Sequence, residues 1–301
     1  MVTGAGTTVT VTEADVRLVQ ELDRDPVATY ATLAERLGVG ERTVARRYRR
    51  LVELGLIRIV ARTLPGFEGG VGWLIRTWSD TAHASRLSKA LARQPRSRWV
   101  RTSTAGDQVV WGLVSSPGPG DPVLSGVTDD PRVRGIESMQ LLEVWTVHGQ
   151  AAVEWPKYRL DDVDRAVIAA LRVDGRRSNS VIAASAGVDP ATVARRTRRL
   201  VESGTLYYEV EIDPAVQGLG VDTMIWITMA PGQLGQLAEK LSRHPYCRFV
   251  AATSGRFSLA LNVVLPRYQD VVTFVDGELA GCGVVSQEVV PMSRALKRGA
   301  R

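Results

Sequence analysis

The sequence predicts an α+β fold in which two winged helix-turn-helix domains alternate with two ferredoxin-like βαββαβ domains. One observation is a repeat: "TVARRYRRLVELG" at 43–55 returns as "TVARRTRRLVESG" at 192–204, with eleven of thirteen residues identical. A second is the helical periodicity, interrupted by glycines, that precedes each copy. A third is the strand-rich segment that follows each copy. The predicted domains are 11–64, 68–150, 158–213 and 218–292.

The composition indicates a globular protein of the cytoplasm. Apolar residues make up 45% of the 301 positions and charged residues 23%, and the net charge is +6. These fractions are ordinary for folded domains. Cys247 and Cys282 are too few for a disulfide framework or a zinc cage, which favours a reducing compartment. The start of the chain lacks the pattern of a signal peptide, and its longest apolar stretch is too short to span a membrane.

The repeat extends well beyond the thirteen residues. An offset of 149 places Asp15 on Asp164 and Gly38 on Gly187, and no gap is needed from Asp15 to Gly55. Self-similarity at a fixed offset indicates an internal duplication.

Each copy is predicted to contain three helices, which in the first copy lie near 13–24, 30–37 and 41–54. In the second copy, Gly175 ends the first helix and Gly187 ends the second. Asp189 is a favourable N-cap and Pro190 a favourable first helical residue for the third helix. Short helices joined by a tight turn that contains glycine form a helix-turn-helix.

The third helix of each copy carries arginines opposite an apolar stripe. In the first copy the stripe is predicted to comprise Val44, Tyr48, Leu51 and Val52. The alternative is an ordinary solvated face, but such faces mix charge signs, and like charges at i,i+4 weaken a helix. A duplex phosphate backbone would offset that repulsion. The predicted DNA-binding residues are Arg42, Thr43, Arg46, Arg47, Arg49, Arg50, Thr192, Arg195, Arg196, Arg198 and Arg199.

Apolar, β-branched residues at 55–64 and 204–213 predict the strands of a wing after each third helix. Arg58 and Arg62 in the first wing are expected to reach phosphate. The second wing carries Glu209 and Glu211 at its centre. We therefore expect the two DNA readers, meaning the two helix-turn-helix units with their wings, to differ in how they contact DNA.

The two remaining segments, 68–150 and 218–292, have a different pattern, in which strands alternate with helices. The second reads strand, helix, strand, strand, helix, strand between 221 and 291, which is the βαββαβ order of a ferredoxin-like fold. The first begins in the same way, but the stretch 116–133 contains four prolines and three glycines where the second helix belongs. We therefore expect the first domain to depart from the pattern there.

The second half, with "SNSVIAASAGVDPATVARRTRRLVESGTLYYEVEIDPAVQGLG" followed by "PYCRFVAATSGRFSLALNVV", resembles the Lrp/AsnC family of transcription regulators. The likeness covers about 160–292 closely and 11–150 more loosely. It implies binding to double-stranded DNA, homo-oligomers, and ferredoxin-like domains, called RAM, that pair with one another, here within one chain. It also implies an amino-acid-like effector bound between RAM domains.

The resemblance places effector contacts at one turn of the second RAM domain. These residues are Thr253, Ser254, Gly255, Arg256, Phe257 and Ser258. Family members that bind amino acids typically have an acidic residue at the end of this turn, and Ser258 stands there instead. The alternative is a glycine that only supplies turn geometry.

Enzyme signatures such as GxxxxGK[ST], GxSxG and HExxH do not occur in the sequence, and no cofactor or metal site is predicted. One enzymatic alternative comes from relatives of the same architecture, the sirohaem decarboxylases, which hold a tetrapyrrole with histidines and arginines. His244 and Arg248 would be the residues to inspect. A decarboxylase gives no reason for two arginine-rich third helices, so the prediction is a regulator without enzymatic activity.

Overall fold

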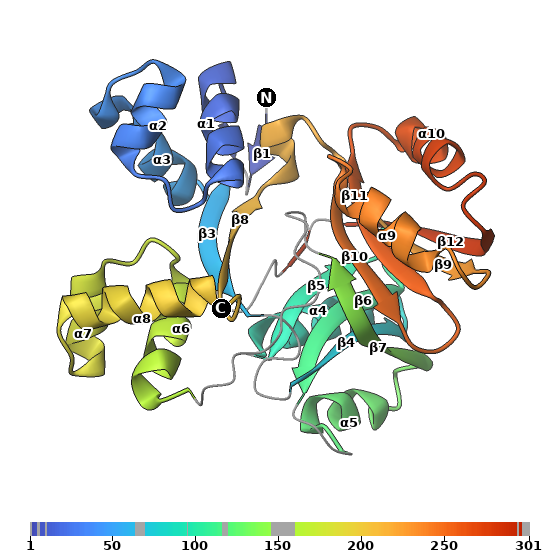
Figure 1. Ribbon diagram of the computed structural model, residues 1–301. Helices are drawn as coiled ribbons and strands as arrows, with labels where there is room; N and C mark the ends of the chain where they lie inside the picture. The colour runs from blue at the N-terminus through green and yellow to red at the C-terminus, as the bar shows by residue number, and fades with distance from the viewer. Residues whose placement is uncertain are drawn as a thin grey trace. The chain divides into compact units, whose positions relative to one another are not determined.

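A computed structural model describes residues 2–4, 7–9, 11–63, 70–94, 96–115, 120–145, 160–293 and 295–296. The chain divides into two compact units, each assembled from both halves of the sequence (Figure 1). Unit 1 comprises Met1–Leu64 and Val153–Leu219, and unit 2 comprises Pro65–Ala152 and Gly220–Arg301. The predicted domain boundaries at 64, 68, 150 and 158 lie outside the described residues.

Unit 1 contains both predicted three-helix groups. The first copy consists of α1 (Glu13–Arg24), α2 (Tyr30–Leu37), α3 (Glu41–Glu53) and β3 (Ile57–Arg62), after a short hairpin of β1 (Val2–Gly4) and β2 (Thr7–Val9). The second consists of α6 (Asp162–Val173), α7 (Asn179–Ala186), α8 (Pro190–Glu202), β8 (Tyr207–Ile212) and the 3₁₀ turn Pro214–Gln217. The predicted duplication is therefore confirmed helix by helix.

The same local signals begin and end the helices in both copies. A capping box starts α1, in which the Thr12 and Asp15 side chains each accept a hydrogen bond from the other residue's backbone N–H. Asp161 and Asp164 do the same for α6. Gly38 and Gly187 end α2 and α7 in the left-handed conformation, with φ of 65° and 67°.

The apolar stripe of the third helix is correct for three of its four predicted residues. Val44, Tyr48 and Leu51 are buried in the core of the first copy, whereas Val52 is 39% exposed. Val201, its counterpart, is 40% exposed. The reason is geometric, because eight residues of α-helix turn through more than two full circles and leave Val52 well off the direction of Val44.

The two predicted wings are one shared ribbon, which corrects the prediction. β3 pairs with β8 in antiparallel register from Ile57 with Ile212 to Arg62 with Tyr207 (Figure 1). Val60 lies opposite Glu209, and these two residues are separated by the repeat offset of 149. Equivalent residues thus face each other, so a pseudo-twofold axis passes through the ribbon at this pair.

Charge complementarity holds the ribbon together, and this corrects the phosphate role predicted for Arg58 and Arg62. Arg58 pairs with Glu211 at 2.8 Å, and Arg62 pairs with Glu209 at 3.1 Å and also with Glu211. Arg62 is buried. The acids that distinguish the second wing neutralise the arginines of the first.

Arg176 of the second copy also joins the two copies. Its Nε donates to the Pro26 carbonyl at 3.2 Å and its guanidinium donates to the Ala28 carbonyl at 2.5 Å. The guanidinium lies 5.4 Å from the Tyr30 ring centroid and 5.1 Å from that of Tyr48. We expect Arg176→Ala to lower the stability of unit 1 by about 1–2 kcal/mol, because it removes charge-assisted hydrogen bonds and cation–π interactions.

Thermal or urea unfolding of the full chain measures this effect. Arg177→Ala is the matched control, since it removes the neighbouring charge from an exposed position and should change stability by less than about 0.5 kcal/mol. Equal effects of the two substitutions would contradict the assigned role of Arg176.

Unit 2 contains the ferredoxin-like halves. The first half consists of β4 (Val71–Trp78), α4 (Thr81–Arg93), β5 (Ser97–Thr102), β6 (Gln108–Ser115), α5 (Pro122–Thr128) and β7 (Gly135–Trp145). The second consists of β9 (Val221–Met229), α9 (Leu234–Ser242), β10 (Cys247–Thr253), β11 (Leu259–Leu265), α10 (Tyr268–Glu278) and β12 (Val284–Met292). Both have the βαββαβ order, as predicted.

The first half has its second helix, although its sequence predicted a departure from the pattern there. Asp121 caps α5 by accepting from the backbone N–H groups of Val123 and Leu124, and Pro122 occupies the first turn. Proline is favourable at that position because its missing N–H would have no helical partner. The helix has only seven residues, and its proline lies in the first turn, so the proline-rich and glycine-rich stretch can still form it.

The two halves meet along both of their edges, so the predicted pairing of RAM domains within the chain is observed. The strand order is β12-β9-β11-β10-β7-β4-β6-β5, with β10 and β7 antiparallel at the junction. At the far edges, Ser103 bridges to Met292, and the Ser293 N–H donates to the Thr102 carbonyl at 2.7 Å. Side chains of both halves, including Leu74 and Trp226, share one apolar cluster. Within the described residues, every helix is too short or too polar to cross a bilayer.

Candidate nucleic-acid interface

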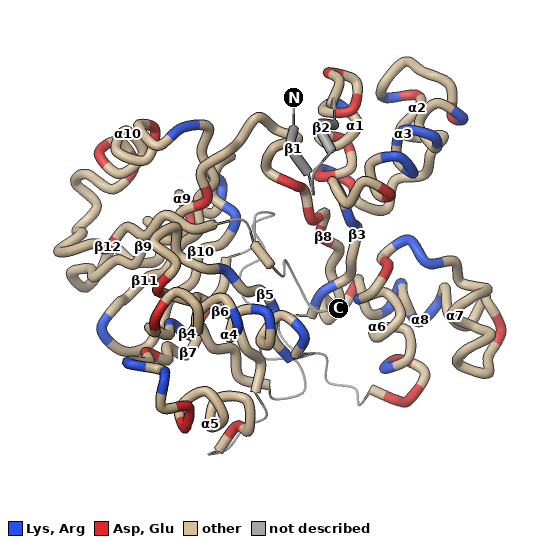
Figure 2. The backbone as a smooth tube through the Cα atoms, turned by 180° about the vertical axis from the view of Figure 1, so that it is seen from behind, with Lys and Arg blue, Asp and Glu red and all other residues tan. Residues whose placement is uncertain are grey.

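The arginines of the third helices, α3 and α8, differ in how exposed they are and in whether a buried aspartate pairs with them. Figure 2 shows the basic positions along both helices in blue. Arg46 and Arg49 of α3, and Arg195 and Arg198 of α8, are exposed, and Arg42 is exposed at the start of α3. Their exposure agrees with the prediction that these side chains point away from the core, and their contact with DNA stays a prediction.

The predicted contacts Arg47 and Arg50 have a partner that sequence reasoning missed. Asp15, buried in the first turn of α1, pairs with Arg47 at 3.4 Å and with Arg50 at 3.1 Å. The side chains of Arg47 and Arg50 remain 30% and 44% exposed. A buried carboxylate thus fixes the orientation of two arginines whose outer edges still reach solvent.

The second copy repeats this arrangement. Asp164 is fully buried and pairs with Arg199 at 2.7 Å and with Arg196 at 3.3 Å, and Arg196 also pairs with Asp161 at 2.8 Å. The signal was available in the sequence, because Asp15 and Asp164 coincide in the repeat alignment although their role is not evident from periodicity.

The charge state of Asp15 follows from its surroundings. Burial raises the pKa of this carboxyl, but hydrogen bonds from Thr12 and the charges of Arg50 and Arg47 outweigh burial and hold the pKa below its ordinary value of 3.8. Its contribution to stability is therefore present above that value and is lost as the pH falls through the lowered pKa. At neutral pH the two arginines face a carboxylate.

The two predicted threonines are placed differently. Thr192 donates its hydroxyl proton to the Asp189 carboxylate at 2.7 Å, and its backbone N–H donates to the same group at 2.8 Å. Thr43 lies at the same position of α3, where the N-cap is Gly40 and no side chain caps the helix. The N-terminal ends of the two third helices therefore differ in chemistry.

The turn predicted to bind an effector is occupied by contacts within unit 2. The Thr253 hydroxyl donates to the Phe257 carbonyl at 2.8 Å, and the Ser254 hydroxyl accepts from the Gln140 N–H at 2.9 Å. The Ser258 hydroxyl accepts from the Met229 N–H at 3.2 Å. Gly255 has φ of 90°, a conformation that favours glycine.

Arg256 and Phe257 of this turn lie against a buried arginine, Arg76. Arg256 pairs with Glu137 at 3.6 Å and with Glu288 at 3.4 Å, and the same two carboxylates pair with Arg76. Phe257 is buried, and its ring centroid lies 5.7 Å from the Arg76 guanidinium. The position of the turn is thus coupled to a charge cluster that joins both halves of unit 2.

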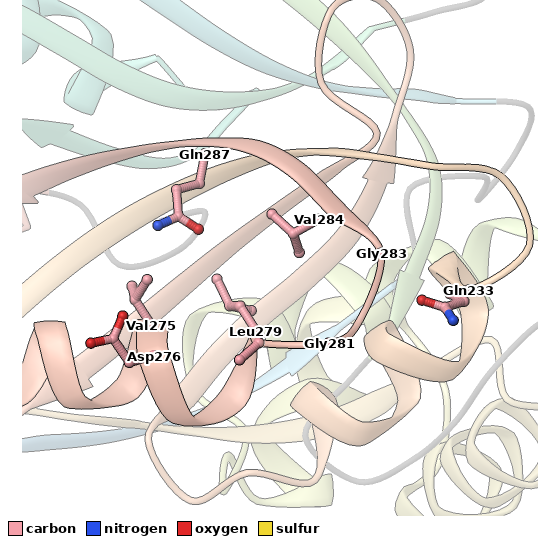
Figure 3. A pocket seen from close by; sticks show the side chains of 9 residues that line it. Gln233, Val275, Asp276, Leu279, Gly281, Gly283, Val284 and Gln287 are labelled. Carbon is pink, nitrogen blue, oxygen red and sulfur yellow. The ribbon is translucent and has the colours of Figure 1, made fainter.

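A pocket of about 720 Å³ lies elsewhere, between α10, the start of β12 and the start of α9 (Figure 3). Val275, Leu279 and Val284 form its apolar wall, and Gln233 and Gln287 lie at its sides. The residues predicted for an effector do not line it.

The tetrapyrrole alternative named His244 and Arg248, and both residues lie in unit 2. His244 packs against Phe274 and Tyr246, with ring centroids 5.1 Å and 5.5 Å away, and its Nδ1 accepts from the Tyr246 N–H at 3.2 Å. Burial lowers the pKa of His244. Arg248 lies on β10 and is half-buried, and His148 is outside the described residues. Among the described residues, no three His, Cys, Asp or Glu side chains are grouped as metal ligands.

Comparison with known proteins identifies this architecture. The AsnC-type helix-turn-helix domain matches at residues 11–52 and again at 160–201. The HTH-type transcriptional regulator AldR of Mycolicibacterium smegmatis is 33% identical over 132 residues, which are 40% of this chain and 77% of that protein. An uncharacterized HTH-type transcriptional regulator of Pyrococcus horikoshii is 28% identical over 145 residues, which are 48% of this chain and 92% of its own length.

A similar fold over nearly the whole chain occurs in the crystal structure of the siroheme decarboxylase NirDL. The TM-score is 0.66 at 12% identity, covering 95% of this chain and 93% of the other. At that identity the likeness concerns the fold alone.

The duplicated helix-turn-helix and the paired ferredoxin-like sheet define the chain as a tandem helix-turn-helix protein with RAM domains. The relatives that share its sequence narrow the class further. The chain belongs to the Lrp/AsnC family of HTH-type transcriptional regulators.

Proposed function

We propose that the chain regulates transcription by binding duplex DNA with both third helices, α3 and α8. The observation that carries this proposal is the pair of exposed arginine faces on helices related by the pseudo-twofold axis of the ribbon. Within the described part of the chain, no acidic side chain pairs with Arg46 or Arg195. An α-helix fits the major groove of duplex DNA. Arginines at the edges of its exposed face can then contact the phosphates that flank the groove.

In this proposal the arginines have two roles. Arg42, Arg46, Arg49, Arg195 and Arg198 contact the DNA directly, together with Thr43. Arg47, Arg50, Arg196 and Arg199 are held by Asp15 and Asp164 and approach phosphates with the exposed parts of their side chains. Because one chain carries both readers, it serves as the equivalent of a dimer of simpler relatives.

Replacing Arg46 and Arg195 together by alanine tests this function. We expect binding to weaken by roughly ten- to a hundredfold. The slope of log affinity against log salt should fall by about one for each arginine–phosphate ion pair that the substitutions remove. Fluorescence anisotropy with labelled duplex DNA over a series of salt concentrations measures both quantities.

The control is Arg17→Ala with Arg243→Ala, which removes the same charge from exposed positions on α1 and next to α9. Affinity and salt slope that fall equally in both double variants would assign binding to net charge rather than to the third helices. The decarboxylase alternative would be favoured by two results together. DNA affinity would be unchanged in the variant with Arg46 and Arg195 both replaced by alanine, and the wild-type chain would show a spectral shift when sirohaem is added.

An effector is the second part of the proposal. Since Ser258 replaces the acid expected at the turn and Arg256 projects there with 64% of its side chain exposed, the proposed ligand is held by its carboxylate rather than by its amino group. Ligand binding to the native state raises stability. A thermal-shift screen should therefore respond to amino acids and simple carboxylic acids but not to amines, and no shift with either class would leave the turn structural.

A further inference from the structure

We infer that this chain recognises an inverted repeat whose two halves differ, so that it binds DNA in one orientation, with Arg42 reading a base that has no counterpart in the other half. The inference rests on the proposed DNA-binding function and specifies its target. It follows from the symmetry of unit 1 and from where that symmetry fails.

The symmetry comes from the β3–β8 ribbon. Val60 and Glu209 are equivalent residues that pair with each other, so the helices of the first copy are related to those of the second by a twofold rotation (Figure 1). Two readers related in this way match half-sites of opposite direction. The expected site is therefore an inverted repeat rather than a direct one.

The symmetry fails at the N-terminal ends of α3 and α8. Arg42 is the second residue of α3, and Ala191 is the second residue of α8. Both positions are exposed. The N-terminal residues of a recognition helix contact base edges, and an arginine there can donate two hydrogen bonds to guanine, whereas alanine cannot.

The neighbouring residues enlarge this difference. In α8, the Asp189 carboxylate accepts both donors of Thr192. Hydrogen bonds from the Thr192 hydroxyl and backbone lower the pKa of Asp189. In α3, Gly40 occupies the cap, so Thr43 faces no such carboxylate, although Glu41 places an acid at the first helical residue.

Because both helix-turn-helix units belong to one chain, the difference between α3 and α8 can set the orientation of the chain on DNA. Two identical chains forming a dimer present the same reader twice, and their site has no preferred direction. Here Arg42 is present once for every pair of readers, so one half-site gains an interaction that the other lacks. The orientation of the DNA site then fixes the orientation of the whole chain.

Selection of bound sequences from random duplex DNA with the full chain tests this inference. The wild-type site should be an inverted repeat with one more specified base pair in one half. Arg42→Ala should relax that base pair alone and weaken binding roughly tenfold. Ala191→Arg should add the same preference to the other half.

The decisive variant is the exchange R42A/A191R, which keeps the net charge and should move the extra base pair to the opposite half. A symmetric wild-type site, or an exchange that leaves the selected site unchanged, would overturn the inference while leaving DNA binding intact. Absence of salt-dependent DNA binding by the wild-type chain would instead overturn the proposed function.

Discussion

Replacing Glu137 and Glu288 together by alanine should destabilise unit 2 by about 3 kcal/mol, because the change leaves a buried guanidinium without its carboxylates. Arg76 projects from β4 with only 1% of its side chain exposed. Its guanidinium lies 4.0 Å from the Trp226 ring centroid and 4.8 Å from that of Trp78. A charge in this position is costly unless it is paired.

The opposite substitution, Arg76→Met, should cost much less, about 1 kcal/mol or below. The Glu137 and Glu288 side chains are 24% and 37% exposed, so water and Arg256 still stabilise them when Arg76 is gone. Methionine fills similar space between the two indole rings. Breaking a buried ion pair is costly when the charge left behind stays buried and uncompensated. After Arg76→Met the remaining charges are two partly exposed carboxylates, whereas the double glutamate variant leaves a buried guanidinium.

Urea unfolding followed by tryptophan fluorescence measures both variants. Six of the seven tryptophans belong to unit 2, so the signal reports this unit rather than the DNA readers. Glu143→Ala is the control, since it removes an exposed carboxylate from the same strand, β7. If Arg76→Met were more damaging than the double glutamate variant, the cluster would be stabilised mainly by packing, not by charge compensation.

The helices of unit 1 could be predicted from the sequence because their signals are local. Asp189 and Pro190 begin α8, and Gly38 and Gly187 end the helices before the turns, and each signal acts within a few residues. Helical periodicity also located the buried Val44 and Leu51. Local geometry decides these features, and tertiary contacts do not override it.

The ribbon could not be predicted in the same way, because its pairing is not local. A strand at 57–62 has the same apolar pattern whether it pairs within its own copy or with the other copy. The one available clue was charge, since Arg58 and Arg62 in one strand complement Glu209 and Glu211 in the other. This charge difference predicted a difference in DNA contacts between two separate wings, whereas the two strands pair with each other.

The candidate site shows the same division between local and non-local information. The spacing on α3 predicted which arginines point away from the core, and the exposure of Arg46 and Arg49 agrees. The partnership of Arg50 with Asp15 depends on how α1 packs against α3, which periodicity within one helix does not contain.

The second copy has the same kind of ion pair, in which buried Asp164 pairs with arginines of α8 and stabilises the helix-turn-helix. Asp164→Ala should destabilise the second helix-turn-helix by about 3 kcal/mol. The substitution removes the capping box of α6, worth about 1 kcal/mol, and removes the Asp164 carboxylate from Arg199 and Arg196, of which Arg196 keeps its ion pair with Asp161. Because the two arginines are 23% and 42% exposed, hydration recovers part of the loss, which places the cost at the lower end for a broken buried pair.

Hydrogen exchange of the amides of α6 and α8 measures the change in the affected copy alone, since local opening reports local stability. Asp162→Ala is the matched control: it removes a carboxylate from the same first turn, but the Asp162 side chain is fully exposed, so its effect should stay within about 0.5 kcal/mol. Asp15→Ala should lower protection in α1 and α3 by at least as much as Asp164→Ala does in the second copy, because Asp15 also accepts the Thr12 hydroxyl at 2.6 Å. If Asp164→Ala were as mild as Asp162→Ala, the buried carboxylates would not anchor the third helices, and Arg50 and Arg199 would owe their orientation to other contacts.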